Sequence, residues 1–180
     1  GLELRPEKTQ VWSPQTPCPA SLVPQWRDSG LTFVGVPVGD HLPTDDQPAA
    51  DDGQRVDLGT PGFAAQRCLE VARRAGALLD RVAELPSLAS PHLPAVQASA
   101  LLLRMCGATK VNHLLRTPPP RDVNPAAAAF DDALLNAYVG LSQLDTLSTG
   151  ERQQCQLPLR LGGRGLRSQQ ACAPAAWAGS

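Results

Sequence analysis

Apolar residues recur at helical spacing through most of the second half of the chain. After Thr60-Pro61 they fall at intervals of three and four residues, and the arginines of this stretch lie mostly on the opposite face. Thr as N-cap and Pro at the first helical position are typical of a helix start, and Pro86 is expected to end the helix. The apolar positions are Leu69, Ala72, Ala75, Leu78, Leu79 and Val82.

Two longer helices are predicted further along. One begins near Pro94, reaches Cys106 and ends at Gly107, and its low polarity predicts that it is largely buried. The residues Pro118–Pro120 are expected to form a stiff spacer, after which Asn124-Pro125 repeats the signature of a helix start. The apolar face of that helix carries Phe130, Leu134, Ala137, Leu141 and Leu144.

Shorter helices are predicted near the end. The residues Ser148–Glu151 fit a capping box that opens a helix to about Cys155. Gly162–Gly165 is interpreted as a turn between elements, because it matches no phosphate-loop pattern. Ser168 is expected to cap a last helix that Pro174 weakens.

The first forty residues have the pattern of β-structure. Residues 2–12 alternate apolar and polar side chains, which predicts a strand interrupted at Pro6. Residues 31–38 are rich in β-formers around Gly35, which predicts a tight hairpin or a bent strand. Residues 41–59 are acidic and almost without apolar side chains, so they are predicted to form a mobile loop. We therefore expect a mainly α fold with a small β portion at 1–40, an acidic loop at 41–59 and a helical region at 60–180.

Composition narrows the class of protein. Hydrophobic residues make up 42% of the 180, but aromatic residues only 4%, so the core is expected to consist of Leu, Val and Ala. The five cysteines are scattered and odd in number, which argues against a zinc site and a disulfide framework and predicts reduced thiols. There is neither a secretory leader pattern nor a run of apolar residues long enough to cross a membrane, so we expect an intracellular protein of unknown compartment.

The net charge of −1 conceals an uneven distribution. Residues 28–57 hold seven Asp and one Arg, whereas 101–121 and 152–180 each hold four basic residues and no acid. Such asymmetry fits a face that meets phosphate. It fits equally well with arginines that decorate solvated helix faces.

Three short motifs, in this order, resemble one known family. They are Gly-Leu-Glu-Leu-Arg-Pro-Glu-Lys-Thr at 1–9, Leu-Thr-Phe-Val-Gly-Val-Pro-Val-Gly at 31–39, and Leu-Pro-Leu-Arg-Leu-Gly-Gly-Arg-Gly-Leu at 157–166. Together they are similar to the C-terminal palm and thumb portion of a non-LTR retroelement reverse transcriptase. The resemblance implies a palm hairpin followed by a helical, thumb-like bundle, and as parent activity RNA-directed DNA synthesis.

The resemblance also implies roles for individual residues. Lys8 matches the lysine of the family's Lys-Thr pair, where it would contact the incoming triphosphate or donate a proton to the leaving pyrophosphate. Phe33, Val34, Gly35 and Val36 match the hairpin that grips the primer. In the thumb-like region, the expected contacts to the nucleic-acid backbone are Arg104, Lys110, Arg116, Arg160, Arg164 and Arg167.

The implied partners are an RNA-template/DNA-primer duplex and the upstream palm and fingers of the same polypeptide. Mg²⁺ is implied for the full-length parent, but no cofactor is expected to bind to this part. The pairs Asp45-Asp46, Asp51-Asp52 and Asp131-Asp132 lack the family's aromatic-x-Asp-Asp register, so none is expected to be the catalytic pair. His41, His92 and His113 are too dispersed to bind a metal together.

Because the chain starts with Gly and its only methionine is Met105, we expect a fragment. The resemblance implies that the catalytic aspartates lie upstream of Gly1, so this fragment is not expected to polymerise by itself. One alternative is a helical interaction module derived from a decayed or domesticated retroelement. Another is an unrelated helical protein. Basic residues gathered on one face would favour nucleic acid, and an exposed leucine patch would favour a protein partner.

Overall fold

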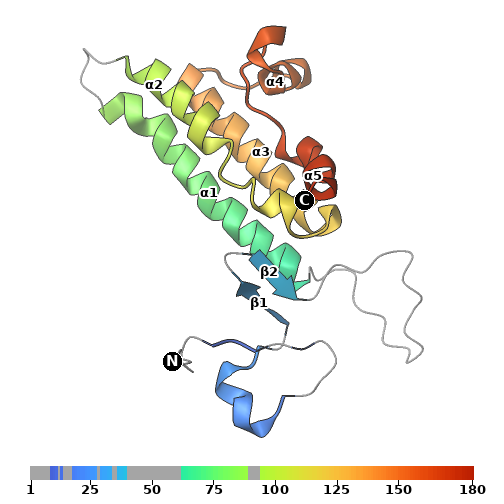
Figure 1. Cartoon of the computed structure of the whole chain (residues 1–180). Helices are drawn as coiled ribbons and strands as arrows, with labels where there is room; N and C mark the ends of the chain where they lie inside the picture. The colour runs from blue at the N-terminus through green and yellow to red at the C-terminus, as the bar shows by residue number, and fades with distance from the viewer. Residues whose placement is uncertain are drawn as a thin grey trace, which may run out of the picture.

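The computed structural model describes residues 9–11, 13, 18–27, 29–33, 36–39, 62–88 and 94–180. In this part the protein is mainly helical, as predicted, with one small antiparallel strand pair (Figure 1). The predictions for Lys8, Val34, Gly35 and the acidic stretch 41–59 lie outside the described residues.

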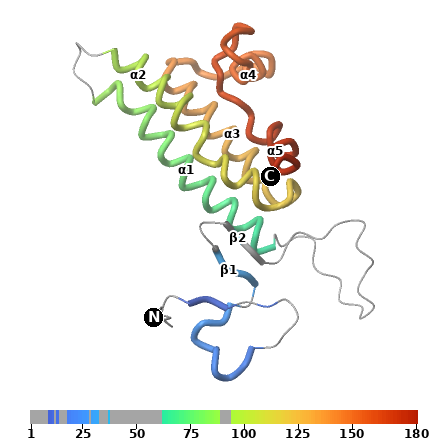
Figure 2. Tube along the Cα trace, viewed as in Figure 1, coloured from blue at the N-terminus to red at the C-terminus, as the bar shows by residue number. Residues whose placement is uncertain are grey.

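Two long helices form the body of the fold. Helix α1 (Phe63–Leu88) lies along α3 (Pro120–Ser142), and α2 (Ala95–Leu102) continues without a break into a π-helix, η3 (Leu103–Gly107) (Figure 2). These helices, together with the segment that joins η3 to α3 and parts of the C-terminal region, bury a core that is rich in alanine and leucine and poor in aromatic residues, as the composition predicts. Its largest fully buried side chains are Phe130, Leu79, Leu103, Leu114, Leu134, Val111 and Val123.

The predicted end of α1 was wrong. The helix passes through Pro86 and ends two residues later, at Leu88. Pro86 lacks the N–H that would close one helical hydrogen bond and crowds the preceding turn, and the helix continues for only two residues after it. The predicted start at Thr60-Pro61 lies outside the described residues.

The start of α3 was also predicted too late. The helix begins at Pro120 and holds Pro125 inside it, so Pro120 belongs to the helix and not to a spacer. A proline at the first helical position lacks a donor that would have no helical partner in any case. Along the rest of α3 most of the predicted face is confirmed, because Phe130, Leu134, Ala137 and Leu141 are buried. Leu144 was predicted wrongly, since α3 ends at Ser142 and Leu144 is 46% exposed.

Helix α2 is less buried than its low polarity predicted. Val96 is 49% exposed, Leu101 54% and Met105 58%, while Leu103 is fully buried. One side of the α2–η3 helix packs on α1, and the other side keeps apolar residues at the surface.

The helix caps predicted near the C-terminus are confirmed. Helix α4 (Thr149–Gln156) opens with a capping box, in which the Ser148 hydroxyl accepts from the Glu151 N–H at 3.4 Å and the Glu151 carboxylate accepts from the Ser148 N–H at 2.8 Å. Helix α5 (Gln169–Ala178) continues past Pro174, and the Ser168 hydroxyl accepts from the Ala171 N–H at 3.1 Å. Two short 3₁₀ helices connect these elements: η4 (Leu114–Arg116) lies before α3, and η5 (Leu159–Leu161) lies between α4 and α5.

The hairpin predicted at 31–38 is present. Strand β1 (Gly30–Phe33) pairs antiparallel with β2 (Val36–Gly39), with Leu31 opposite Val38 and Phe33 opposite Val36. It lies at the start of α1, which β2 contacts (Figure 1). A short N-terminal part, with the 3₁₀ helix η2 (Ala20–Gln25), lies beyond it, and there a single parallel bridge joins Val11 to Trp26. In the described part of the chain, no helix is both long and apolar enough to cross a lipid bilayer.

Candidate nucleic-acid interface

Three of the six residues predicted to contact the nucleic-acid backbone line the same hollow. Arg104 from η3, Arg116 from η4 and Arg167 from the segment before α5 line a hollow of about 480 Å³, which we call the basic hollow. Its other polar lining includes Thr109, Asn112 and Gln169, and no acidic side chain of the described residues lines it. The fold therefore brings together cationic groups that are up to sixty-three positions apart in the sequence.

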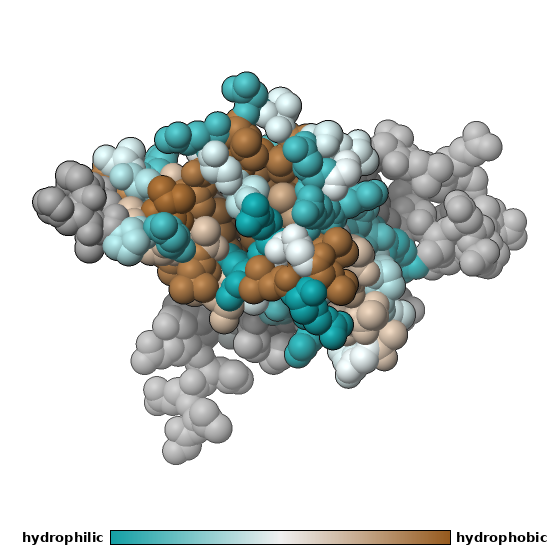
Figure 3. Space-filling view, turned by 90° about the horizontal axis from the view of Figure 1, so that it is seen from above, coloured by the Kyte–Doolittle hydropathy of each residue, from teal (hydrophilic) through white to brown (hydrophobic). Residues whose placement is uncertain are grey.

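A neighbouring hollow is mostly apolar. It has a volume of about 400 Å³, and Arg104 and Arg164 line it together with exposed and half-buried apolar side chains. We call it the apolar groove, and its apolar lining includes Val96, Ala100, Leu101, Tyr138, Leu141, Leu159 and Leu166. On the face seen from above, hydrophobic patches alternate with hydrophilic side chains (Figure 3). Because Arg104 and Leu159 line both hollows, the two lie next to each other.

The glycine turn at 162–165 shapes this region. Gly162 and Gly165 have positive φ angles of 76° and 73°, and a Cβ at Gly165 would stand 3.0 Å from the Arg104 Cδ. A Cβ at Gly163 would stand only 2.0 Å from the backbone oxygen of Leu157. These glycines let the turn fold back closely on α4 and leave space for the stem of Arg104. The prediction of a turn is thus confirmed.

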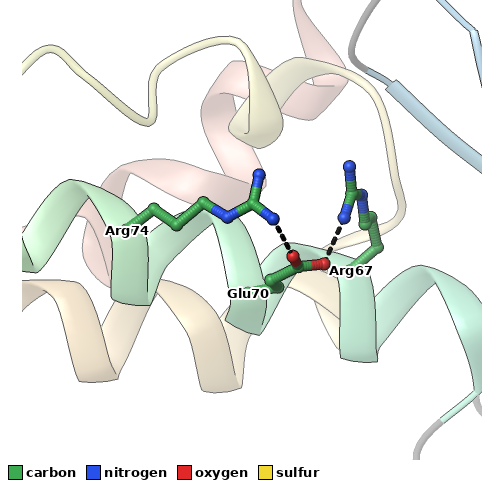
Figure 4. A network of polar contacts seen from close by, with 3 residues as sticks. All are labelled: Arg67, Glu70 and Arg74. Atoms are coloured by element: carbon green, nitrogen blue, oxygen red, sulfur yellow. Dashed lines mark hydrogen bonds and ion pairs between the residues drawn. The ribbon is translucent and has the colours of Figure 1, made fainter.

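The arginines of the two hollows are not used in ion pairs within the described residues, whereas two on α1 are. Glu70 accepts hydrogen bonds from both Arg67 and Arg74 (Figure 4). These bonds and charges, the Arg67 hydrogen bond first, lower the pKa of Glu70. Arg104, Arg116, Arg164 and Arg167 have no such carboxylate among the described residues, so their charge remains for a ligand.

The other predicted site residues lie apart from these hollows. Lys110 and Arg160 are exposed and line neither of them. Phe33 and Val36 are the last pair of the β1–β2 register. The stem of that hairpin, from Gly30 to Thr32, lines a third hollow of about 320 Å³ against the start of α1, where Arg67 and Glu70 also lie.

The pair Asp131-Asp132 has a structural use. The Asp131 carboxylate is buried and accepts hydrogen bonds from the Ser168 hydroxyl at 2.6 Å, the Gln169 N–H at 2.7 Å and the Gln170 N–H at 3.2 Å. Burial raises the pKa of Asp131, and these hydrogen bonds oppose that rise. Asp132 faces solvent and pairs with Arg152 at 2.8 Å. The two carboxylates therefore serve different partners, which fits the interpretation that they are not a metal-binding pair.

This anchor for α5 was missed by the sequence argument. The signal was present, because Asp131 lies at helical spacing from the buried Ala127 and Leu134. A buried carboxylate on the apolar face of a helix requires hydrogen-bond donors. The Ser168 hydroxyl and the first N–H groups of α5 supply them.

Among the residues that the structure describes, no group of three or more His, Cys, Asp or Glu side chains is arranged to hold a metal ion. A scan against protein-family models, a search of curated proteins and a search of solved structures each found no match to this chain. The fold and the site define a mainly helical protein with two adjoining hollows, one of them basic.

Proposed function

We propose that this chain is the C-terminal palm and thumb portion of a non-LTR reverse transcriptase and that it holds an RNA-template/DNA-primer duplex. The observation that carries the proposal is the basic hollow. Arg104, Arg116 and Arg167 converge there with no acid in the described lining and no ion pair within the described residues. Guanidinium groups placed in this way bind backbone phosphates without reading sequence.

The glycine turn supports the same proposal. It belongs to the segment at 157–166 that resembles the family, and it positions two of the proposed contacts, Arg164 directly and Arg104 through Gly165. The β1–β2 hairpin at the start of α1 would provide the primer grip, with Lys8 near the triphosphate. In this proposal the catalytic aspartates and their Mg²⁺ ions belong to the upstream part of the parent. The chain alone should then bind a duplex but incorporate no nucleotide.

A fluorescence-anisotropy titration with a labelled RNA/DNA hybrid tests the proposal. The triple variant Arg104→Ala, Arg116→Ala, Arg167→Ala should bind at least about tenfold more weakly, since each phosphate contact contributes to affinity. The matched control is Arg73→Ala, Arg81→Ala, Arg121→Ala, which removes the same charge from exposed arginines outside both hollows.

If both triple variants weaken binding equally, the affinity reflects total charge and the proposed interface is wrong. Nucleotide incorporation by the isolated chain would contradict the assignment of the chemistry to the upstream part.

One observation favours the second candidate, a helical interaction module. The apolar groove leaves Leu101 54% and Leu159 56% exposed, with Arg104 and Arg164 beside them. An amphipathic helix with acidic flanks would complement such a groove. The change Leu101→Ser, which adds no charge beside Arg104 and Arg164, should abolish the capture of a protein partner without affecting hybrid binding, whereas loss of hybrid binding alone would argue against the module.

A further inference from the structure

Gln169, the first residue of α5, lines the basic hollow and has an unsatisfied polar atom. The residue is only 3% exposed. Its side-chain Nε2 donates to the backbone oxygen of Arg167 at 3.1 Å, whereas its Oε1 is buried without a hydrogen-bond partner among the described residues. Buried acceptors of this kind are rare in native proteins and call for a donor.

The neighbouring carbonyl fixes which end of the amide remains unpaired. The backbone oxygen of Arg167 only accepts hydrogen bonds, so the amide nitrogen must face it and the oxygen must face elsewhere. The missing partner is therefore an N–H or O–H donor. A bare phosphate would satisfy the arginines of the hollow but would offer no such donor to Gln169 when fully ionised.

The rest of the hollow supplies two further kinds of contact. Arg104, Arg116 and Arg167 provide positive charge, and the exposed side chains of Met105 and Leu159 provide apolar surface. The volume of about 480 Å³ is within the range of small-molecule sites. A ligand that uses all of the hollow needs an anionic group, a flat or apolar body and an N–H donor.

We propose that the basic hollow binds one unpaired nucleotide. Its phosphate lies against Arg104, Arg116 and Arg167, its base packs on the apolar wall, and the buried Gln169 Oε1 turns toward the hollow to accept from an amine of the base. This inference rests on the proposed function, because it gives one part of the same basic face a specific ligand. The contact with Gln169 would favour bases that carry an N–H donor, whereas the phosphate contacts do not depend on the base sequence.

Isothermal titration calorimetry with three probes tests the site. Adenosine monophosphate offers both phosphate and amine, purine riboside monophosphate lacks the amine, and adenosine lacks the phosphate. We expect the monophosphate with the amine to bind about tenfold more tightly than either of the others, since a buried hydrogen bond and a charged contact are each of that order. Equal affinity for the two monophosphates would overturn the role of Gln169.

The variant Gln169→Met supplies the second arm. It keeps the side-chain length and removes the unpaired oxygen, so it should fold and should bind both monophosphates equally. If Gln169→Met still binds adenosine monophosphate about tenfold more tightly than purine riboside monophosphate, the proposal is contradicted, whatever the other results.

Binding of two RNA/DNA hybrids, one blunt and one with an unpaired adenine, shows whether the nucleotide belongs to a bound strand or is free. If the site takes a nucleotide of a bound strand, a hybrid with one unpaired adenine should bind more tightly than a blunt one, and only when Gln169 is present. If it takes free nucleotide, the two hybrids should bind equally and the monophosphate should still bind. Failure of all mononucleotides and of the unpaired adenine, with blunt-hybrid binding retained, would refute the nucleotide site and leave the proposed function standing.

Discussion

At the residue scale, Asp131 shows how one buried side chain can fix the position of a helix. It lies on α3, and its carboxylate binds the hydroxyl of Ser168 and the first two N–H groups of α5. Because α5 carries Gln169 and follows Arg167, this contact also orders one wall of the basic hollow.

Removal of this carboxylate should loosen α5. We expect Asp131→Ala to lower the free energy of unfolding by about 2 to 3 kcal/mol, because buried donors lose a charged acceptor. Asp132→Ala, its exposed neighbour, removes only a surface pair with Arg152 and should change the free energy by less than about 0.5 kcal/mol. Urea denaturation of both variants makes the comparison, and equal losses would contradict the anchoring role.

Because of Cys68, the free energy of unfolding should decrease at alkaline pH. Burial first, and then the charge of Asp122, raise the pKa of this thiol from 9.0 to about 11. In the unfolded chain the thiol ionises near pH 9, whereas in the fold it stays neutral to about pH 11. The contribution of the neutral Cys68 thiol to the free energy of unfolding is therefore complete below pH 9 and is lost as the pH rises through 11. It amounts to about 2 to 3 kcal/mol.

The measurement is the free energy of unfolding from pH 8 to pH 11 for the parent chain and for Cys68→Ala. The parent should lose stability over this interval, and the variant should lose less of it, whatever its stability at pH 8. Parallel curves would show that the buried thiol does not contribute.

At the element scale, the turn at 162–165 is the feature on which the proposed interface most depends. It returns the chain from η5 toward α5, with the Gly165 N–H donating to the Leu157 oxygen at 2.9 Å and the Leu166 N–H to the Cys155 oxygen at 3.1 Å. At Gly163 the backbone passes so close to Leu157 that no side chain fits.

A methyl group at this position should therefore be costly. We expect Gly163→Ala to destabilise the fold by about 3 kcal/mol, because the obstructing atom is backbone and cannot rotate away. Gly140→Ala is the matched control, since a Cβ there meets nothing within 4 Å inside helix α3. That change should stabilise by about 0.5 to 1 kcal/mol. Thermal unfolding distinguishes the two, and a neutral Gly163→Ala would contradict the described turn.

The elements were largely predictable from the sequence because their signals are local. The capping box at Ser148 and the apolar stripe of α3 each depend on residues a few positions apart. Both were predicted correctly, apart from Leu144 beyond the end of α3. The errors at Pro86 and Pro120 share a cause: proline restricts the backbone, but its position within a helix decides the effect. The burial of α2 was predicted wrongly, because an apolar helix does not reveal whether a neighbour covers both of its sides.

At the scale of the whole molecule, the sequence predicted which residues carry charge but not which of them meet. Arg104, Arg116 and Arg167 gather only because η3, η4 and the turn before α5 fold onto one another. Lys110, equally basic in the sequence, lines neither hollow. The role of Asp131 and the unpaired oxygen of Gln169 also depend on contacts between α3 and α5, which no local pattern contains.

The most direct test of the account is the salt dependence of hybrid binding. For the intact chain, the logarithm of the association constant should fall linearly with the logarithm of KCl concentration, with a slope of about −3 or steeper. The triple variant at Arg104, Arg116 and Arg167 should have a slope smaller in magnitude by about 2 to 3, because each lost phosphate contact releases one counterion fewer. A slope near zero for the intact chain, or the same slope for both proteins, would contradict a duplex-binding function for the basic hollow.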